Sequence, residues 1–176
     1  QNISTNGAQD WESFEINGET YLAVANNFDD STGNISSVVY KWDTATSQFT
    51  SVQSIATSGI AGWESFEIAG KTYLAAANSF NGSTYNIDSV IYKWDTATSQ
   101  FTLVQNIPTV GIVDWQSFEV NGETYLVAAN NWNGSTNNVD SVIYKWDTAT
   151  SQFTQLQSIA TIGAYDWQSF QINGET

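Results

Sequence analysis

The sequence predicts an all-β protein: a β-propeller segment of about three and a quarter blades, each blade made of four antiparallel strands. The first observation is a repeat, since Trp11, Trp63, Trp115 and Trp167 are each separated by 52 residues. The second is that each period holds four short runs of β-branched and aromatic residues, separated by turns rich in Gly and Asn. Four short strands in a period of about 40–50 residues are typical of a propeller blade.

The first period shows these strands in order. Its first strand is expected at Trp11–Ile16, and the Asn17-Gly18 pair that follows favours a two-residue type I′ hairpin. A polar loop separates the second strand from the third, and the single proline, Pro108, is expected in a connection between strands. The remaining strands of this period are predicted at Glu19–Asn26, Ser36–Asp43 and Gln48–Ile55.

The whole chain, 1–176, is interpreted as one propeller segment. Residues 1–10 match the end of a preceding blade, and 167–176 match the first strand of a further blade, expected to lie innermost against the third blade. Three blades cannot close a ring, which takes about four to eight. We therefore expect a segment of a longer repeat chain; the alternative is a short chain that polymerises, its unpaired strand completed by a neighbour through β-augmentation. The blades are placed at 11–62, 63–114 and 115–166.

Charge and composition exclude several classes of function. The chain has 18 acidic residues against 4 lysines and no arginine, a net charge of -14, so it repels nucleic acid and anionic lipid. No apolar run is long enough for membrane insertion. Without His or Cys there is no His-based triad, zinc cluster or thiol nucleophile. The acids recur in near-identical surroundings, which disfavours the unlike carboxylate pair of a glycosidase. The expectation is a non-enzymatic protein.

Acidic residues recur next to the tryptophan of each first strand. Asp10, Asp114 and Asp166 precede three of these tryptophans, and Gly62 takes the fourth position. First strands line the channel of a propeller, so these carboxylates would converge near its mouth and suit calcium, a hard cation that binds oxygen ligands. The alternative is that each Asp caps its own turn or bonds the neighbouring blade. Further acids along the same strands, among them Glu12 and Glu64, have the same two interpretations.

The loops between second and third strands, 27–34, 79–86 and 131–138, are the most variable part of each period. Their aromatic side chains either stack on a sugar or partner surface or fold back on their own blade. The candidate residues for binding a partner are Phe28, Asp29, Asp30, Phe80, Asn81, Trp132 and Asn133. The asparagines that end each second strand form either a ring of ligand-binding groups or buried amides that bond the backbone between blades; they are Asn26, Asn78 and Asn130.

Three stretches carry a family resemblance: "GAYDWQSFQINGET" at 163–176, "ETYLVAANN" at 123–131 and "VDSVIYKWD" at 139–147. Together they resemble the EAR repeat, also called EPTP, of the leucine-rich glioma-inactivated proteins and related proteins. The resemblance implies a propeller that is secreted or on the cell surface, works through protein–protein contacts and can hold a metal in its channel. Gly62-Trp63 departs from the family's Asp-Trp pattern, and the close similarity of the repeats indicates recent duplication.

The function expected is an extracellular, non-enzymatic recognition or adhesion module that binds protein or glycan at its loop face, with calcium as its only candidate cofactor. The alternative is a structural subunit whose repeats self-assemble into a fibre or surface layer. That assembly would use the open blade faces and strand edges of the array.

Overall fold

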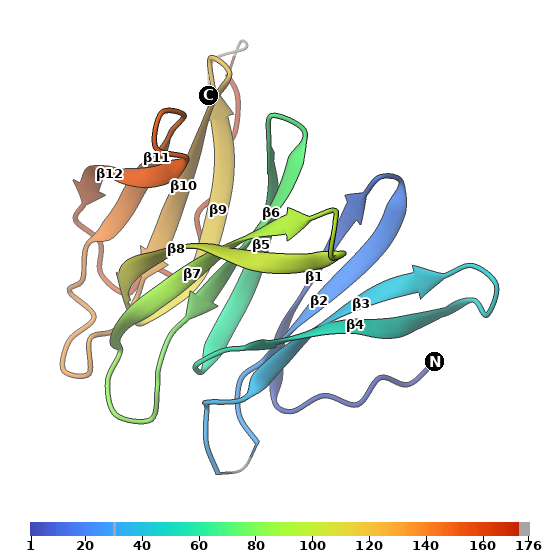
Figure 1. The fold of residues 1–176 in the computed structure, drawn as a ribbon. Coiled ribbons are helices and arrows are strands. Elements are labelled where there is room, and N and C mark those ends of the chain that lie inside the picture. Colours follow the sequence, from blue (N-terminus) through green and yellow to red (C-terminus); the bar gives the residue numbers. More distant parts are fainter. Residues whose placement is uncertain (30, 173–176) are drawn as a thin grey trace.

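The computed structural model describes residues 1–29 and 31–172. In these ranges the chain forms twelve β-strands in three four-stranded antiparallel sheets (Figure 1) and no helix. Each sheet is a meander, in which the strands pair in the order of the chain. The prediction of four antiparallel strands per period is confirmed. No helix in the described part of the chain is long and apolar enough to cross a membrane.

Equivalent strands recur in all three sheets. Sheet 1 consists of β1 (Ala8–Ile16), β2 (Glu19–Asn26), β3 (Ser36–Asp43) and β4 (Gln48–Ala56). Sheet 2 consists of β5 (Ile60–Ile68), β6 (Lys71–Asn78), β7 (Asn86–Asp95) and β8 (Gln100–Val110). Sheet 3 consists of β9 (Ile112–Val120), β10 (Glu123–Asn130), β11 (Ser141–Asp147) and β12 (Gln152–Ile159).

β2 and β3 have the predicted bounds, and β4 is one residue longer, ending at Ala56. Two larger differences from the sequence prediction occur. β1 begins at Ala8 rather than Trp11, because its pairing with β2 continues past a bulge to the Ala8–Asn26 pair. The expectation that Pro108 lies in a connection is wrong, since Pro108 is inside β8 and pairs with Asp88. β8 is the outermost strand of sheet 2, where a missing backbone N–H removes no bond to a further strand.

The hairpin turns between first and second strands have the predicted type I′ conformation. Asn17 and Gly18 both have positive φ, 52° and 77°. Sheet 2 uses Ala69 and Gly70 at the same place, with φ of 51° and 68°. Alanine adopts this left-handed conformation at a cost, whereas asparagine tolerates it.

Replacing Ala69 by asparagine should therefore stabilise the protein by about 0.5–1 kcal/mol. The side chain at this position is exposed, so the gain comes from the backbone and not from new packing. Denaturant unfolding at equilibrium measures the difference. The reverse change at the equivalent turn, Asn17→Ala, should cost a similar amount, and a neutral result for both variants would contradict the argument.

The hydrophobic core lies between the sheets rather than within them, in two clusters. The first joins sheets 1 and 2: Phe14 packs edge-on against Phe101 at 5.7 Å, and Tyr21 packs against Trp94 at 5.4 Å. The second joins sheets 2 and 3 with the equivalent rings, such as Tyr73 against Trp146 at 5.4 Å. The strands are rich in apolar residues on both faces because both faces of sheet 2 are covered.

Two tryptophans of the first strands, Trp63 and Trp115, pack against the preceding sheet and donate hydrogen bonds to its backbone. Trp63 Nε1 donates to the carbonyl oxygen of Val24 at 3.1 Å, and Trp115 Nε1 donates to that of Ala76 at 3.4 Å. Trp63 and Trp115 are 4% and 2% exposed, whereas Trp11 is 40% exposed because no described sheet packs on it. The side chain of Trp167 is half-buried, and its Nε1 is buried without a hydrogen-bond partner among the described residues.

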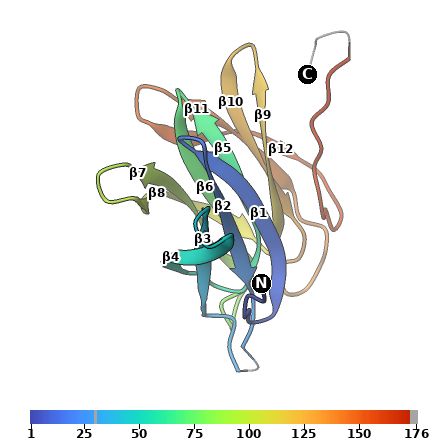
Figure 2. The same ribbon diagram turned by 90° about the vertical axis from the view of Figure 1, so that its right-hand side faces the viewer.

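The segment after β12 begins against sheet 3, as Figure 2 shows from the side. Gly163 N–H donates to the carbonyl oxygen of Asn137 at 2.8 Å, and Asn131 Nδ2 donates to that of Ala164 at 3.2 Å. The expected innermost strand is not formed over 167–171, because no described residue pairs with this segment as β6 pairs with β5. Residues 173–176, the remainder of that expected strand, lie outside the described residues.

Candidate functional site

The first strands of the three sheets, called the inner strands here, lie side by side: β1 contacts β5, and β5 contacts β9. Acidic side chains lie along these contacts and form the acidic row: Asp10, Glu12, Glu64, Asp114 and Asp166. Asp10 Oδ2 accepts a hydrogen bond from the Trp63 backbone N–H at 3.0 Å. Glu12 Oε1 accepts from the backbone N–H and the hydroxyl of Ser65, at 3.0 and 2.6 Å. Glu64 Oε1 accepts from the Ser117 N–H at 2.7 Å. These three acids therefore hold successive sheets together, as the second interpretation of the sequence anticipated.

Asp114 is the most strongly perturbed member of this row. Burial, then the negative charges of Asp166 and Glu64, raise the pKa of the Asp114 carboxyl to about 7. The side chain of Asp166 faces that of Asp114, and this contact also favours the protonated form of Asp114 and so raises its pKa. Burial likewise raises the pKa of Glu64, and the nearby charges of Glu12 and Asp10 act in the same direction. The row thus concentrates negative charge that is only partly neutralised.

Gly62 explains why Asp10 and Asp114 differ. Gly62 faces Asp10 with no side chain, and even an added Cβ would make only an ordinary contact with Asp10 Oδ2, at 3.4 Å, so nothing competes with that carboxylate for the Trp63 N–H. At the equivalent place beside Asp114 stands Asp166, a second carboxyl group. The departure from the repeat at position 62 therefore converts an acid pair into an acid–backbone contact.

Protein stability should fall as the pH rises from about 4 to about 7, through the titration of Asp114. The folded protein keeps a proton that the unfolded chain has released in this range, so deprotonation near pH 7 opposes folding. Asp114→Asn cannot ionise, and at about pH 8 it should be more stable than the unmodified protein by about 1 kcal/mol, a value reduced by solvent screening. Urea unfolding across this pH range measures the effect.

The control for this prediction is Asp147→Asn. Turn hydrogen bonds, the first from the Ala149 N–H, lower the pKa of Asp147, so this variant should lose stability relative to the unmodified protein above pH 4. The same pH profile for both variants would show that Asp114 is not the titrating group.

The residues described do not by themselves fit a calcium cage. Within residues 1–29 and 31–172, no group of three or more acidic side chains converges as metal ligands. Asp10 is bonded to the neighbouring backbone, and Asp114 and Asp166 face each other at the next contact. These sheets offer part of a ligand set at most, and the calcium prediction remains a prediction.

The variable loops share one turn, in which the oxygen of an Asx side chain accepts hydrogen bonds from the backbone. Asp29 Oδ1 accepts from the N–H groups of Ser31 and Thr32 at 3.2 and 3.0 Å. Asn81 and Asn133 make the same pair of bonds in their own loops, at 2.9 to 3.0 Å. The three candidate residues thus fix loop shape, and only the first adds a charge. Asp30 lies outside the described residues.

The loop aromatics differ in how far they fold back. Phe28 is 47% exposed. Phe80 stacks on Tyr85 with ring centroids 4.5 Å apart, and Trp132 is half-buried. Phe80 therefore folds back on its own loop, whereas Phe28 is exposed and its stacking on a partner or sugar remains a prediction.

The strand-ending asparagines are buried and structural. Asn26 Oδ1 accepts from the Asn6 N–H at 3.1 Å, while its Nδ2 donates to the carbonyl oxygen of Ser36 at 3.0 Å. Asn78 and Asn130 repeat this pattern. The carbonyl oxygen of Ser36 belongs to the same sheet as Asn26, and Asn6 lies in the segment that precedes this sheet. Each amide therefore connects its own sheet to the segment before it and does not connect two sheets.

A groove at the loop end of the molecule separates the loops of sheets 1 and 2. Its volume is about 460 Å³. Its walls include the aromatic side chains of Phe28, Phe80 and Tyr85 and the hydroxyl-bearing residues Ser31 and Thr32. These residues come from the two most variable stretches of the first two periods, which makes this groove the best candidate for contact with a partner.

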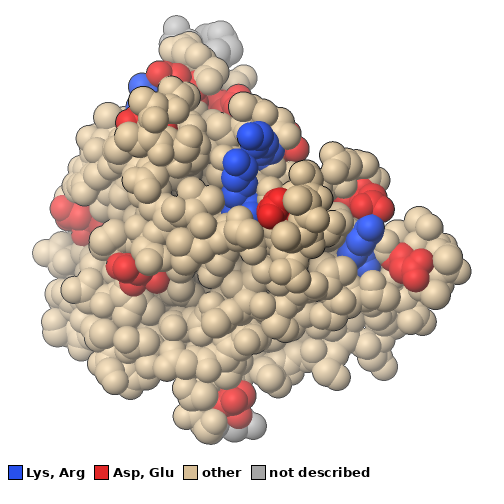
Figure 3. Space-filling view, in the orientation of Figure 1, with Lys and Arg blue, Asp and Glu red and all other residues tan. Residues whose placement is uncertain are grey.

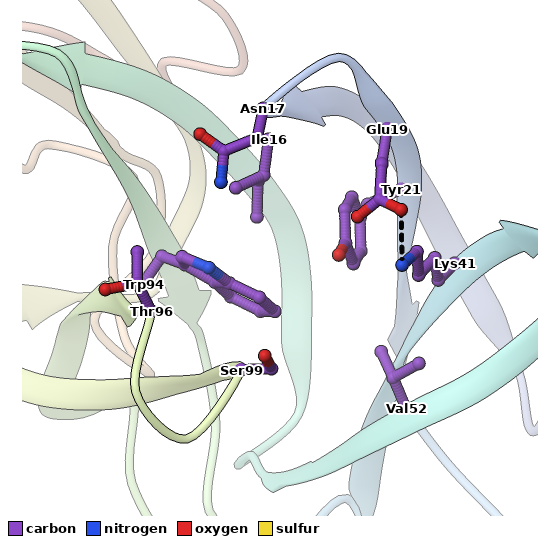
Figure 4. Close-up of a pocket in the computed structure, with 9 residues that line it drawn as sticks. All are labelled: Ile16, Asn17, Glu19, Tyr21, Lys41, Val52, Trp94, Thr96 and Ser99. Atoms are coloured by element: carbon purple, nitrogen blue, oxygen red, sulfur yellow. Dashed lines mark ion pairs between the residues drawn. The ribbon is translucent and has the colours of Figure 1, made fainter.

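A smaller groove of about 250 Å³ lies between the same sheets at the opposite, turn end (Figure 4). Glu19 and Lys41 form an ion pair of 2.7 Å on one side of it, beside the ring of Tyr21. Trp94 and Val52 form much of the remaining wall. Because its charged groups neutralise each other, this groove presents little that is free to bind a ligand.

The sequence interpretation missed a glutamine clamp on the outer strands. Gln53 Nε2 donates to the carbonyl oxygen of Phe101 at 2.9 Å, and Gln53 Oε1 accepts from the Phe101 N–H at 2.7 Å. Gln105 clamps Phe153 in the same way. The repeat could have revealed this clamp, because the two glutamines are 52 residues apart and so hold the same place in successive periods. A polar side chain on the last strand of a sheet is, however, ordinarily expected to face solvent.

Comparison with known proteins places this architecture in a family. A model of the EPTP domain matches residues 1–43, 48–95 and 100–147.

The chain belongs to the EPTP family.

The EPTP unit is out of phase with the sheets by one strand. The match at 48–95 joins β4 of sheet 1 to β5, β6 and β7 of sheet 2, and the match at 100–147 makes the same junction one sheet later. The second and third EPTP units therefore each join the last strand of one sheet to the first three strands of the next. The hydrogen bonds from Trp63 to Asp10 and to Val24 connect residues of two different units.

The relatives of this EPTP chain are longer proteins. It is 45% identical to the human thrombospondin-type laminin G domain and EAR repeat-containing protein, over 97% of this chain and 34% of that protein. The mouse protein of the same description is 41% identical over 83% of this chain and 22% of its own length. Mouse leucine-rich repeat LGI family member 3 is 28% identical over 77% of this chain and 23% of its length. The resemblance to the EAR family is confirmed, and the chain spans about a third or less of these relatives.

A solved structure confirms the fold without bearing on activity. The putative 6-phosphogluconolactonase of Bacteroides fragilis superposes with a TM-score of 0.66 at 17% identity, over 91% of this chain and 41% of that one. At that identity the likeness concerns the EPTP sheets alone.

Proposed function

We propose that this chain is part of an extracellular β-propeller that recognises a protein partner through its loop end and catalyses no reaction. The three sheets are blades in this proposal, and further repeats would close the ring. The single observation that carries it is the loop design: one fixed Asx turn in all three loops supports aromatic side chains that differ from loop to loop. Rigid scaffolds with variable loops are typical of binding proteins.

The relatives support a role in recognition. Their names describe laminin G domains, EAR repeats and leucine-rich repeats. The chain has neither His nor Cys, and the acids of the inner strands accept hydrogen bonds from the neighbouring backbone, which gives them a structural role. The proposal includes that the protein is secreted, that it acts in adhesion or recognition, and that its partner is a protein and not a glycan.

The test is binding of the fluorescently labelled 176-residue protein to cultured animal cells. The expected result is saturable binding that protease treatment of the cells abolishes and that Phe28→Ser weakens. Leu103→Ser is the matched control, because Leu103 is an exposed apolar side chain, 59% exposed, on the outer strand β8 and away from the loops. Binding that glycosidases abolish and proteases spare would identify a glycan partner, and equal loss in both variants would refute recognition by the loop end.

Self-assembly is the second candidate function, favoured by the exposure of apolar side chains at both ends of the array. Trp11 on one side and Tyr165, Phe170 and Ile172 on the other are 40 to 74% exposed. Native mass spectrometry of the purified protein separates the two functions. One defined species supports the recognition module, and an open-ended ladder of oligomers supports the fibre or surface layer.

We also propose weak calcium binding at the acidic row, supported by the unneutralised charge around Asp114. Calcium at millimolar concentration should then raise the melting temperature by about 2–4 °C, and a chelator should reverse the rise. Asp114→Asn should abolish the shift, whereas magnesium at the same ionic strength should not reproduce it. A melting temperature that calcium leaves unchanged would end this proposal.

A further inference from the structure

The lysines of the chain lie at one of its two ends, whereas acidic residues occur at both. The strand registers place every lysine near the hairpin turns: Lys41 pairs with Tyr21, close to the β1–β2 turn, and the equivalent lysines pair with Tyr73 and Tyr125. Lys71 is the first residue after the β5–β6 turn. All four lysines of the chain therefore lie at the turn end, and the chain has no arginine.

The loop end carries acids alone among the described charged side chains. Figure 3 shows this for one face: the blue side chains lie in its upper and middle parts, whereas the protrusion at the bottom shows red and no blue. Local hydrogen bonds, first from Ser31, lower the pKa of Asp29 and keep its carboxylate ionised. The acids placed at this end by the strand registers and loops are Asp10, Asp29, Asp88, Asp114 and Asp140.

The loop-end groove combines the negative potential of these acidic side chains with the faces of aromatic rings. Phe28, Phe80 and Tyr85 line it, and Asp29 lies between two of its lining residues in the chain, Phe28 and Ser31, and is hydrogen-bonded to Ser31. Aromatic faces attract cations, and a groove within an anionic surface concentrates the negative potential. Its volume of about 460 Å³ suits a few side chains and is too small for a folded domain.

We propose that the loop-end groove binds an extended, lysine- or arginine-rich segment of a partner protein. The cationic side chains of that segment would lie over the rings of Phe28 and Phe80, with Asp29 at the rim as a counter-charge. This inference rests on the proposed recognition through the loop end and names the chemistry of the partner. A basic segment fits because the loop end has no cation that would repel it.

The repeat itself supplies a clean charge probe. Asn81 and Asn133 already make the turn that Asp29 makes, so Asp29→Asn should keep the loop intact and remove only the charge. Asp43→Asn is the matched control: Asp43 Oδ1 accepts from the Ala45 N–H in a similar turn, but at the turn end of the same sheet. Both variants have the same net charge, so they separate a local effect from a global one.

The experiment measures fluorescence anisotropy of a short labelled peptide of alternating lysine and glycine, titrated with the full 176-residue protein. Affinity should fall by about threefold in Asp29→Asn and by about tenfold in Phe28→Ala, and stay unchanged in Asp43→Asn. Raising the salt from about 50 to about 300 mM should weaken binding, since the Debye length shortens. A glutamate–glycine peptide should not bind.

Equal losses in Asp29→Asn and Asp43→Asn would overturn the inference, because the attraction would then be one of net charge. Absence of peptide binding, or salt-independent binding of neutral glycans in its place, would also overturn it. If Phe28→Ser still weakens protease-sensitive binding to cells in that case, recognition by the loop end stands and only the cationic partner is refuted. If both binding experiments fail, the loop end is not a recognition surface.

Discussion

Replacing Trp115 by alanine should destabilise the protein by about 3–5 kcal/mol, enough to remove most of its stability. Trp115 is 2% exposed, belongs to the cluster between sheets 2 and 3, and donates its indole N–H to Ala76. The substitution leaves a large cavity in a contact that holds two sheets together. Urea unfolding followed by circular dichroism measures the change.

The control is the same substitution at an equivalent position of the repeat. Trp11→Ala should cost under about 1 kcal/mol, since Trp11 is 40% exposed and no described sheet covers it. The two tryptophans occupy the same place in the sequence pattern, so the difference between them measures what the neighbouring sheet adds. Similar costs at both positions would mean that the stacked arrangement of the sheets is wrong.

Gly111→Ala should have the second large effect, a loss of about 3 kcal/mol or more. An added Cβ would lie 2.0 Å from the carbonyl oxygen of Trp132, and the backbone at Gly111 has a φ of 49°. The glycine lets the entry to β9 pass directly over the third loop, where Asn131 N–H donates to the Gly111 oxygen at 3.2 Å. Substitution would therefore displace both the strand entry and the loop.

Gly122→Ala separates the two causes. Gly122 also has a positive φ, 77°, but an added Cβ would meet nothing within 4 Å. This variant should lose only the cost of the left-handed conformation, about 1 kcal/mol. Differential scanning calorimetry of both variants gives the comparison, and a Gly111→Ala protein as stable as Gly122→Ala would contradict the close approach.

Much of the fold could be predicted because local chemistry and the repeat agree. The Asn17-Gly18 turn fixes one hairpin and its register, and the runs of β-branched, aromatic and other apolar residues in Glu19–Asn26 and Ser36–Asp43 give strands with the observed bounds. The candidate site was only partly predictable. Asp29, Asn81 and Asn133 were recognised as loop residues, but their shared turn depends on backbone geometry that the letters do not show.

The acids show the same limit more sharply. Asp10 and Asp114 occupy identical places in the repeat, yet one accepts a hydrogen bond from the Trp63 N–H and the other faces the carboxyl group of Asp166. The difference arises from the residue that faces each acid across the contact between sheets, Gly62 or Asp166. That residue is distant in sequence from its partner, so only the packing of the sheets pairs them.

The sequence by itself determined the all-β class, the four-stranded unit and the excess of negative charge, because periodicity, turn chemistry and composition act locally or sum over the chain. The tertiary structure alone decided which side chains work between sheets. A bulge after Val39 makes Val52 an extra residue opposite β3, so that Gln53 reaches Phe101 in the next sheet. Alternation cannot reveal such a shift, since one extra residue reverses which face every later side chain occupies.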